Sequence, residues 1–218
     1  MKALVVFSGG LDSTTALYWA KERFDEVSAV NFSYGANHQQ QEYNAAKQTA
    51  NALGVELFDI PLAFIGQHFK SALLGGIVPD GEYQPDNMKS TVVPFRNGIM
   101  LSVAAGLANS LGYDAIVLGN HGGDHFIYPD CRPGFIKAMD DAIAAGTDEA
   151  VTLFSPFCDM SKADIVKEGA RLGVDFGQTY SCYKGGAIHC GTCATCRERK
   201  EAFIQAGITD PTKYKVNT

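Results

Sequence analysis

Short apolar runs and longer mixed segments alternate along the chain. Five runs are mainly apolar and stop at a glycine, a proline or a polar residue, as buried parallel strands do. These runs are residues 2–7, 27–32, 55–60, 115–119 and 151–154. Six mixed segments have the length and patterning of helices. These segments are residues 11–24, 38–53, 97–111, 135–145, 162–172 and 195–206.

This alternation predicts an α/β fold, with a mostly parallel five-stranded sheet and helices on both of its faces. We expect residues 1–175 to form one domain of this kind and residues 176–218 to form a small C-terminal segment packed on it. In such folds ligands bind beyond the carboxyl ends of the strands. Polar segments at residues 8–13, 33–38 and 120–132 follow predicted strands, so they should meet at one site.

A long segment, residues 75–94, contains three prolines and shows little periodicity. We predict a loop there, which serves as a lid or a binding segment or is simply mobile. A helix cap is expected at Asp12 or Ser13 for the first helix. Asn97 is expected to cap the helix that follows the long loop.

Composition and charge narrow the class of protein. The chain has 218 residues, 46% of them apolar, which suffices for one hydrophobic core. Its formal net charge of -6 argues against a non-specific nucleic-acid binder, which needs a basic surface. No apolar run nears the roughly 20 residues of a membrane span, and residues 1–7 lack the features of a signal peptide. Together with closely spaced cysteines, this predicts a cytoplasmic protein.

The first predicted strand and helix are joined by Ser8-Gly9-Gly10-Leu11-Asp12-Ser13. Two glycines let the backbone approach an anion, and the following helix N-terminus supplies unpaired N–H groups. Ser8, Ser13 and Thr14 add hydroxyl donors, and Asp12 is expected to cap the helix or to bind Mg²⁺. The segment lacks the Walker A lysine and the third dinucleotide-fingerprint glycine. A plain strand–turn–helix corner is the alternative, but the position and the hydroxyls resemble the pyrophosphate loop of N-type ATP pyrophosphatases, which hand on AMP.

Four of the six cysteines crowd into fifteen residues near the C-terminus, as Cys182, Cys190, Cys193 and Cys196. Four thiolates suit tetrahedral zinc, and the two-residue spacings let neighbouring sulfurs face one centre. An iron–sulfur cluster is the alternative. Four protein ligands leave no open position, so a metal here is expected to be structural.

The loop after the fourth predicted strand is rich in ionisable residues. Arg132 can hold a carboxylate or a phosphate through two hydrogen bonds, and Asp124 or Asp130 can accept two from a guanine-like edge. A solvated loop is the alternative for any one residue, whereas the whole cluster at a strand's carboxyl end favours a site. Arg96 and Lys162 are candidate phosphate partners, although a surface position is the default for such residues.

Several of these landmarks together resemble the 7-cyano-7-deazaguanine synthases, the QueC family of the queuosine pathway, over nearly the whole chain. They are the loop at residues 8–13, Tyr34-Gly35 with His38, Pro94 with Arg96-Asn97, Tyr128-Pro129-Asp130-Cys131-Arg132, and Cys182-Tyr183 with the three later cysteines. The resemblance implies an adenine nucleotide alpha hydrolase-like domain that converts 7-carboxy-7-deazaguanine, ammonia and ATP into the nitrile through an adenylate and an amide. It also implies Mg²⁺ with the ATP, a structural zinc and a homodimer.

The candidate site residues fall into four groups. The candidate catalytic residues are Asp12, Arg96, Asp124, Asp130, Arg132 and Lys162. The candidate ATP-binding residues are Phe7, Ser8, Gly9, Gly10, Leu11, Asp12, Ser13, Thr14, Phe32, Gly119 and Asn120. The candidate substrate-binding residues are Tyr34, His38, Arg96, Asn97, Tyr128, Asp130, Cys131 and Arg132. The candidate metal ligands are Cys182, Cys190, Cys193 and Cys196.

The chain departs from the family pattern at a few positions. Phe95 stands where the family has glycine, and Gly122-Gly123-Asp124-His125-Phe126-Ile127 replaces Glu-Thr-Asp-x-Ser-Gly. Phe95 and residues 126–127 are therefore expected to bear on the shape of the base pocket. Two other functions compete with the synthase: a different enzyme of the superfamily, such as a tRNA-modifying or amide-forming enzyme, and a non-catalytic zinc-stabilised nucleotide-binding module.

Overall fold

A computed structural model describes residues 1–215. Its centre is a five-stranded sheet with the order β3-β2-β1-β4-β5, and every neighbouring pair is parallel. The strands are β1 (Lys2–Val6), β2 (Glu26–Ser33), β3 (Leu57–Pro61), β4 (Ala115–Val117) and β5 (Thr152–Phe154). The predicted fold class is confirmed, and each strand lies within a few residues of its predicted run.

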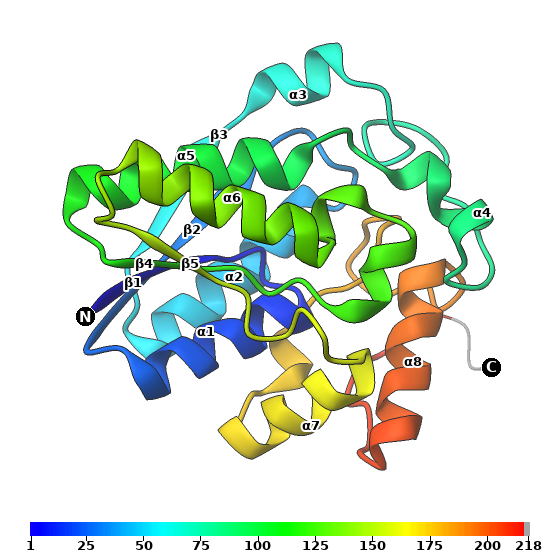
Figure 1. Cartoon of the computed structure of the whole chain (residues 1–218). Coiled ribbons are helices and arrows are strands. Elements are labelled where there is room, and N and C mark those ends of the chain that lie inside the picture. The colour runs from blue at the N-terminus through cyan, green and yellow to red at the C-terminus, as the bar shows by residue number, and fades with distance from the viewer. Residues whose placement is uncertain (216–218) are drawn as a thin grey trace.

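Helices cover both faces of the sheet (Figure 1). They are α1 (Leu11–Arg23), α2 (Gln39–Leu53), α3 (Ala63–His68), α4 (Pro85–Met88), α5 (Arg96–Leu111), α6 (Pro133–Gly146), α7 (Lys162–Leu172) and α8 (Ala194–Ala206). Because side chains of a strand point alternately to its two faces, β1 feeds two cores. Leu4 packs with α5 and α6, whereas Ala3 and Val5 pack with α1 and α7.

The long segment at residues 75–94 is more ordered than a loop. It contains α4 and the 3-10 helix η1 (Lys89–Thr91). Pro85 occupies the first turn of α4, where a backbone N–H has no partner within the helix, so proline costs no hydrogen bond there. The short helix α3 was not predicted either. Turns this short carry too few residues to show a helical period.

Both predicted helix caps are wrong. The N-cap of α1 is Gly10, and no side chain caps this helix; Ser13 instead donates to the Gly10 carbonyl at 3.3 Å. The N-cap of α5 is Phe95. Asn97 lies inside α5, where its side-chain amide donates to the Asp130 carbonyl at 3.2 Å.

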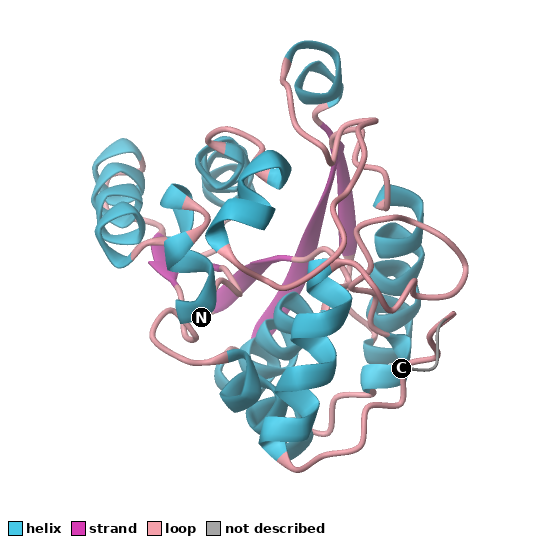
Figure 2. Cartoon of the chain, turned by 90° about the vertical axis from the view of Figure 1, so that its right-hand side faces the viewer, coloured by secondary structure: helices cyan, strands magenta, loops and turns pink. Residues whose placement is uncertain are grey.

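The C-terminal segment packs closely on the rest of the chain. The amide of Tyr180 donates to the Gly9 carbonyl at 3.0 Å. Arg199 of α8 is fully buried, and its guanidinium donates to Thr179, to Ser181 and to the Phe176 carbonyl. The strands' carboxyl ends, which face the viewer in Figure 2, are thus covered by loops and by this segment.

Within residues 1–215, no helix by itself has the length and apolar composition to cross a membrane. One bent pair, Pro85–Thr91 with Arg96–Leu111, meets that test only when the two are taken together across a 52° break.

Candidate active site and metal centre

A cleft opens beyond the carboxyl ends of β1, β2 and β4, as expected for a parallel sheet. Most of the candidate site residues line it. They are Phe7, Ser8, Gly10, Leu11, Asp12, Ser13, Phe32, Tyr34, His38, Arg96, Asn97, Gly119, Asn120, Asp124, Tyr128 and Cys131. Among the candidate catalytic, ATP-binding and substrate-binding residues, five lie outside this lining, namely Gly9, Thr14, Asp130, Arg132 and Lys162.

The phosphate loop between β1 and α1, residues 8–13, is held by its own hydroxyls. Ser8 Oγ lies 3.1 Å from Ser13 Oγ and accepts a hydrogen bond from the Gly10 amide. Since no side chain caps α1, the N–H groups of its first turn are available to an anion. Gly9 has a φ of 87°, and a Cβ there would lie 2.5 Å from the Glu42 carbonyl oxygen. This glycine is thus required by its packing against α2.

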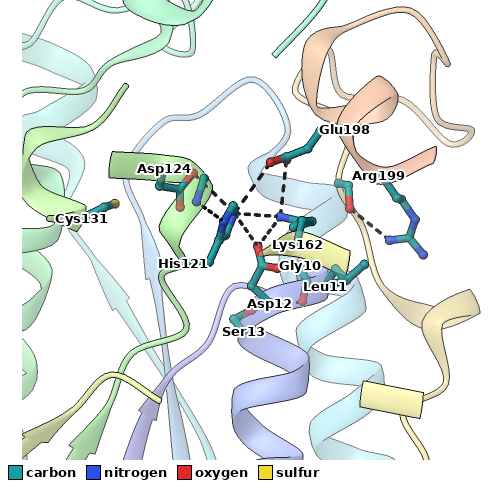
Figure 3. Close-up of polar contacts among 12 residues, drawn as sticks. Gly10, Leu11, Asp12, Ser13, His121, Asp124, Cys131, Lys162, Glu198 and Arg199 are labelled. Atoms are coloured by element: carbon teal, nitrogen blue, oxygen red, sulfur yellow. Dashed lines mark hydrogen bonds and ion pairs between the residues drawn. The ribbon is translucent and has the colours of Figure 1, made fainter. Parts of the chain in front are cut away.

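Lys162 lies at the phosphate loop, surrounded by carboxylates (Figure 3). Its ammonium is 2.5 Å from Asp12 Oδ2 and 3.5 Å from Glu198 Oε2. His121 is buried beside it, with Nε2 3.6 Å from Asp124 Oδ1 and 3.4 Å from the lysine nitrogen. Lys162 lies in the first turn of α7. A capping box between Ser161 and Asp164 fixes this end of the helix.

Burial and charge oppose each other in this cluster. Burial alone would lower the pKa of the Lys162 ammonium, but the carboxylates of Asp12 and Glu198 outweigh it and raise that pKa above its ordinary value. Burial raises the pKa of Glu198, and Lys162 moderates the shift. The lysine therefore stays a cation at the place where the loop would receive phosphates.

The other end of the cleft is aromatic and carries one strong cation. Arg96, from the first turn of α5, donates to the Tyr34 hydroxyl at 3.0 Å. His38 is buried, and its ring stacks on Tyr183 with centroids 4.9 Å apart. Its Nε2 lies 3.6 Å from a carboxylate oxygen of Glu42, which also lines the cleft.

The pKa values of this pair move in opposite directions. Burial, aided by the Arg96 charge, lowers the pKa of His38 to about 4. Burial raises the pKa of Glu42 to about 8, although Arg96 acts against the rise. At neutral pH the imidazole is therefore uncharged and the Glu42 carboxyl group is mostly protonated; its carboxylate form predominates only above about pH 8.

Asp130 and Arg132, predicted to bind ligands, bond other parts of the protein in this structure. Asp130 is buried, and its carboxylate accepts from the Asn97 backbone amide at 2.8 Å, so it fixes the start of α5. Arg132 is exposed, and its Nε donates to the His125 carbonyl. Cys131 accepts from the Asn97 side chain at 3.2 Å. The ligand contacts proposed for these residues stay predictions.

Several cleft residues escaped the sequence analysis. Tyr83, from the long segment at residues 75–94, donates to Asp124 Oδ1 at 2.7 Å. Ser181, Thr195 and Glu198 reach the cleft from the C-terminal segment. No local motif marks them. For Ser181, Thr195 and Glu198, the only signal was their proximity in sequence to the four cysteines.

Phe95, Phe126 and Ile127, at which the chain departs from the family pattern, lie outside the cleft lining. Phe95 is 58% exposed, and its ring meets Phe135 edge-on. Phe126 is 78% exposed, whereas Ile127 packs with Met88 in a small separate core. Ile127 shares this small core with Tyr128 and Cys131, which line the cleft, so its effect on the base pocket stays a prediction.

The four candidate metal ligands converge on one point. The sulfurs of Cys182, Cys190, Cys193 and Cys196 all lie within 4.8 Å of one another. The Cys190 amide donates to Cys182 Sγ, and the Cys193 amide donates to Cys190 Sγ, both at 3.3 Å. Such hydrogen bonds orient sulfurs that bind a metal. Four sulfurs at this spacing suit one tetrahedral ion; a cluster of several irons would hold them farther apart.

Solved structures share the fold at low sequence identity. The NMN synthetase of Francisella tularensis superposes with a TM-score of 0.52 and 12% identity over 95% of this chain and 77% of that one. A predicted subunit of tRNA methyltransferase from Methanocaldococcus jannaschii gives a TM-score of 0.51 and 18% identity over 78% and 74%. These similarities concern the fold alone.

Curated relatives are much closer in sequence, and each is named 7-cyano-7-deazaguanine synthase. The protein of Porphyromonas gingivalis strain ATCC 33277 is 54% identical over 98% of this chain and 97% of its own length. Those of Agrobacterium fabrum strain C58 and Desulfotalea psychrophila are 49% and 46% identical, over 99% and 98% of this chain and 92% and 99% of their own lengths. Residues 2–207 also match the profile of the family described as queuosine biosynthesis protein QueC. The chain therefore belongs to the QueC family.

Proposed function

We propose that this chain uses ATP to convert 7-carboxy-7-deazaguanine and ammonia into 7-cyano-7-deazaguanine. One observation carries the proposal: 54% identity over 98% of the chain to a 7-cyano-7-deazaguanine synthase. The cleft supports it, because the phosphate loop lines the same cleft as Arg96, Tyr34 and Tyr128. An ATP-dependent ligase needs both a nucleotide site and an acceptor site.

The reaction begins with activation, because a carboxylate is a poor electrophile. The substrate carboxylate attacks the α-phosphorus of ATP, the bond to the bridging oxygen of the β-phosphate breaks, and pyrophosphate leaves. Ammonia then displaces AMP to give the amide. The amide oxygen attacks a second ATP in the same way. Departure of that oxygen with AMP, and loss of both protons from nitrogen, leaves the nitrile.

The protein's part in these steps is to position anions and to neutralise charge. Lys162 stands at the phosphate loop as a fixed cation, and Arg96 stands at the acceptor end. Asp12 fits a magnesium ligand, because its Oδ1 is buried and has no hydrogen-bond partner among the described residues. Mg²⁺ bound there would neutralise phosphate charge as pyrophosphate leaves.

Zinc is the metal that we propose for the four cysteines. Their number and spacing suit its tetrahedral preference. With all four positions filled by protein, the ion would hold the C-terminal segment in place and take no part in the chemistry. We also propose a cytoplasmic location and a homodimer, and the family resemblance is the only support for either. Light scattering of the purified protein tests the dimer.

The test is an incubation of the purified protein with ATP, Mg²⁺, ammonium and 7-carboxy-7-deazaguanine, followed by mass spectrometry of the nucleotide and base products. We expect AMP and the nitrile. Asp12→Asn should abolish both products, whereas Asp141→Asn, at an exposed position of α6, should not change them.

Other products would point elsewhere. AMP with the amide would indicate an enzyme that stops after the first activation. ADP would contradict cleavage between the α and β phosphates. ATP binding without any pyrophosphate release would favour a nucleotide-binding module.

A further inference from the structure

Glu42 is a carboxylate in the cleft wall that the steps above do not use. Its side chain is 18% exposed, and it lines the cleft beside Arg96 and His38. Within residues 1–215 its carboxylate accepts no hydrogen bond, and its closest polar neighbour is His38 Nε2 at 3.6 Å. A largely buried carboxylate without a donor is expensive to keep, so without one the group favours its protonated form, whereas a cationic donor in the cleft would stabilise the carboxylate.

His38 forms the wall beside the Glu42 carboxylate. Its side chain is only 2% exposed, and Nε2 is the ring nitrogen that lies 3.6 Å from Glu42. A neutral imidazole can offer an acceptor at this nitrogen. A small cationic ligand with several N–H donors would therefore bond the carboxylate and lie beside Nε2.

Glu42 also lies close to where the chemistry must take place. Its backbone carbonyl packs directly on Gly9 of the phosphate loop, so the first turn of α2 lies beside the loop that would hold ATP. Arg96, which points into the same part of the cleft, bonds the Tyr34 hydroxyl. The Glu42 side chain thus lines the same cleft as the phosphate loop and Arg96.

We propose that Glu42, with His38 beside it, binds ammonium and takes its proton, and so delivers ammonia to the activated carboxylate. This inference rests on the proposed function. Ammonium transfers one proton to the Glu42 carboxylate and becomes ammonia. The nitrogen lone pair then attacks the acyl carbon, the carbon–oxygen bond to AMP breaks with its electron pair on AMP, and the nitrogen loses a second proton to solvent or phosphate.

Glu42 is suited to this proton transfer. Burial raises its pKa to about 8, closer to the pKa of ammonium than that of an ordinary glutamate, so above about pH 8 the carboxylate form predominates and is a more effective base. Afterwards the proton leaves to solvent through the open side of the cleft, and the carboxylate is restored for the next turnover.

The two halves of the reaction provide the test, because only the first half uses ammonia. Glu42→Gln and the wild type are each given ATP, Mg²⁺ and one of two substrates: the carboxylate with ammonium, or the preformed amide without it. We expect Glu42→Gln to lose about 100-fold or more in conversion of the carboxylate but to turn the amide into the nitrile within about 3-fold of the wild type. Glu56→Gln, an exposed glutamate, should match the wild type on both.

Hydroxylamine sharpens the result, because it is uncharged at neutral pH and needs no base to become a nucleophile. With hydroxylamine in place of ammonium, Glu42→Gln should form the hydroxamate at a rate close to the wild type. Amide conversion within the same variant shows that it is folded and binds ATP and the base.

Loss of activity on both substrates would overturn the proposal, and would assign Glu42 to the guanine-like edge or to ATP. Full activity on both would overturn it too, as would failure of hydroxylamine to restore the first half. A wild type that makes no nitrile from either substrate would instead contradict the proposed function, and the ammonium site would fall with it.

Discussion

At the scale of single residues, Glu42 shows how a site residue can weaken the fold that holds it. Its pKa is about 8 in the folded protein against an ordinary 4.5. Between these values the folded state holds the proton more firmly than the unfolded state. The contribution of Glu42 is therefore fully favourable below pH 4.5 and is lost as the pH rises through 8.

This sign gives a prediction for Glu42→Gln, which keeps the shape and removes the ionisation. At pH 8.5 the variant should be more stable than the wild type by an amount on the order of a few kcal/mol. At pH 5 the advantage should be much smaller. Urea unfolding at the two pH values measures the difference, and the exposed Glu56→Gln serves as the control. The pKa of His38 is lowered to about 4, so both proteins lose stability as the pH falls toward that value. Because the loss is the same in both, it cancels in the comparison.

An equal stability difference at pH 5 and pH 8.5 would mean that the carboxyl group is not held in a low-polarity wall. It would also remove the reason for expecting an unusually strong base at this place.

Residue roles were predictable where a local pattern encodes them. The phosphate loop has its glycines, hydroxyls and aspartate within six consecutive positions, residues 8–13, and most of these line the cleft. Glu198 has no such pattern. It looks like an ordinary helix-surface glutamate until α8 is folded across α7, where it meets Lys162. Burial and pairing of this kind depend on tertiary packing, which one-dimensional periodicity does not contain.

At the scale of elements, the strands and longer helices were predictable because each spans several periods of its own pattern. What failed were the ends. The start of α5 is fixed by Asp130, which accepts a hydrogen bond from the backbone amide of Asn97. The two residues are 33 positions apart in the sequence. This long-range partner lets Phe95 precede the helix with a φ of 56°, a conformation that favours glycine.

Two variants at Phe95 separate the strain from the packing of the ring. Phe95→Ala removes the ring and keeps the strained backbone, whereas Phe95→Gly removes the ring and relieves the strain. We expect the glycine variant to be more stable than the alanine variant by about 1 kcal/mol. Thermal or urea unfolding of the two proteins measures it.

Inside a helix the sign is the reverse, because glycine is less favourable there than alanine. At Ala138, an exposed position inside α6, Ala138→Gly should lose about 1 kcal/mol. If Phe95→Gly were instead the less stable of its pair, the positive φ at the start of α5 would carry no strain.

At the scale of the whole molecule, the C-terminal segment and the sheet domain build one cleft. Ser181, Thr195 and Glu198 line it from the segment predicted at residues 176–218, and Tyr180 bonds the phosphate loop. The division at residue 175 stays a prediction about domains. Functionally, the cleft is incomplete without the later residues.

With a metal bound, the four cysteines would therefore link the stability of the fold to the shape of the cleft. Cys193 precedes α8 and Cys196 lies in its first turn, so the metal would fix the helix that carries Glu198 to the cleft. An isolated β-bridge between Asp80 and Cys193 extends the link to the long segment that carries Tyr83. Loss of the ion should loosen both segments at once.

Cys193→Ser tests this link. We expect the variant to lose its bound zinc, measured by elemental analysis, and to lose roughly 3 kcal/mol or more of stability, a fall of about 6–12 °C in Tm for a chain of this size. ATP affinity, measured by calorimetry, should fall with it, because three cleft residues lose their support. Cys158→Ser, a free cysteine away from the metal ligands, should keep zinc, stability and ATP affinity. A zinc-free Cys193→Ser protein with wild-type unfolding and ATP binding would show that the cysteines neither hold the fold nor shape the cleft.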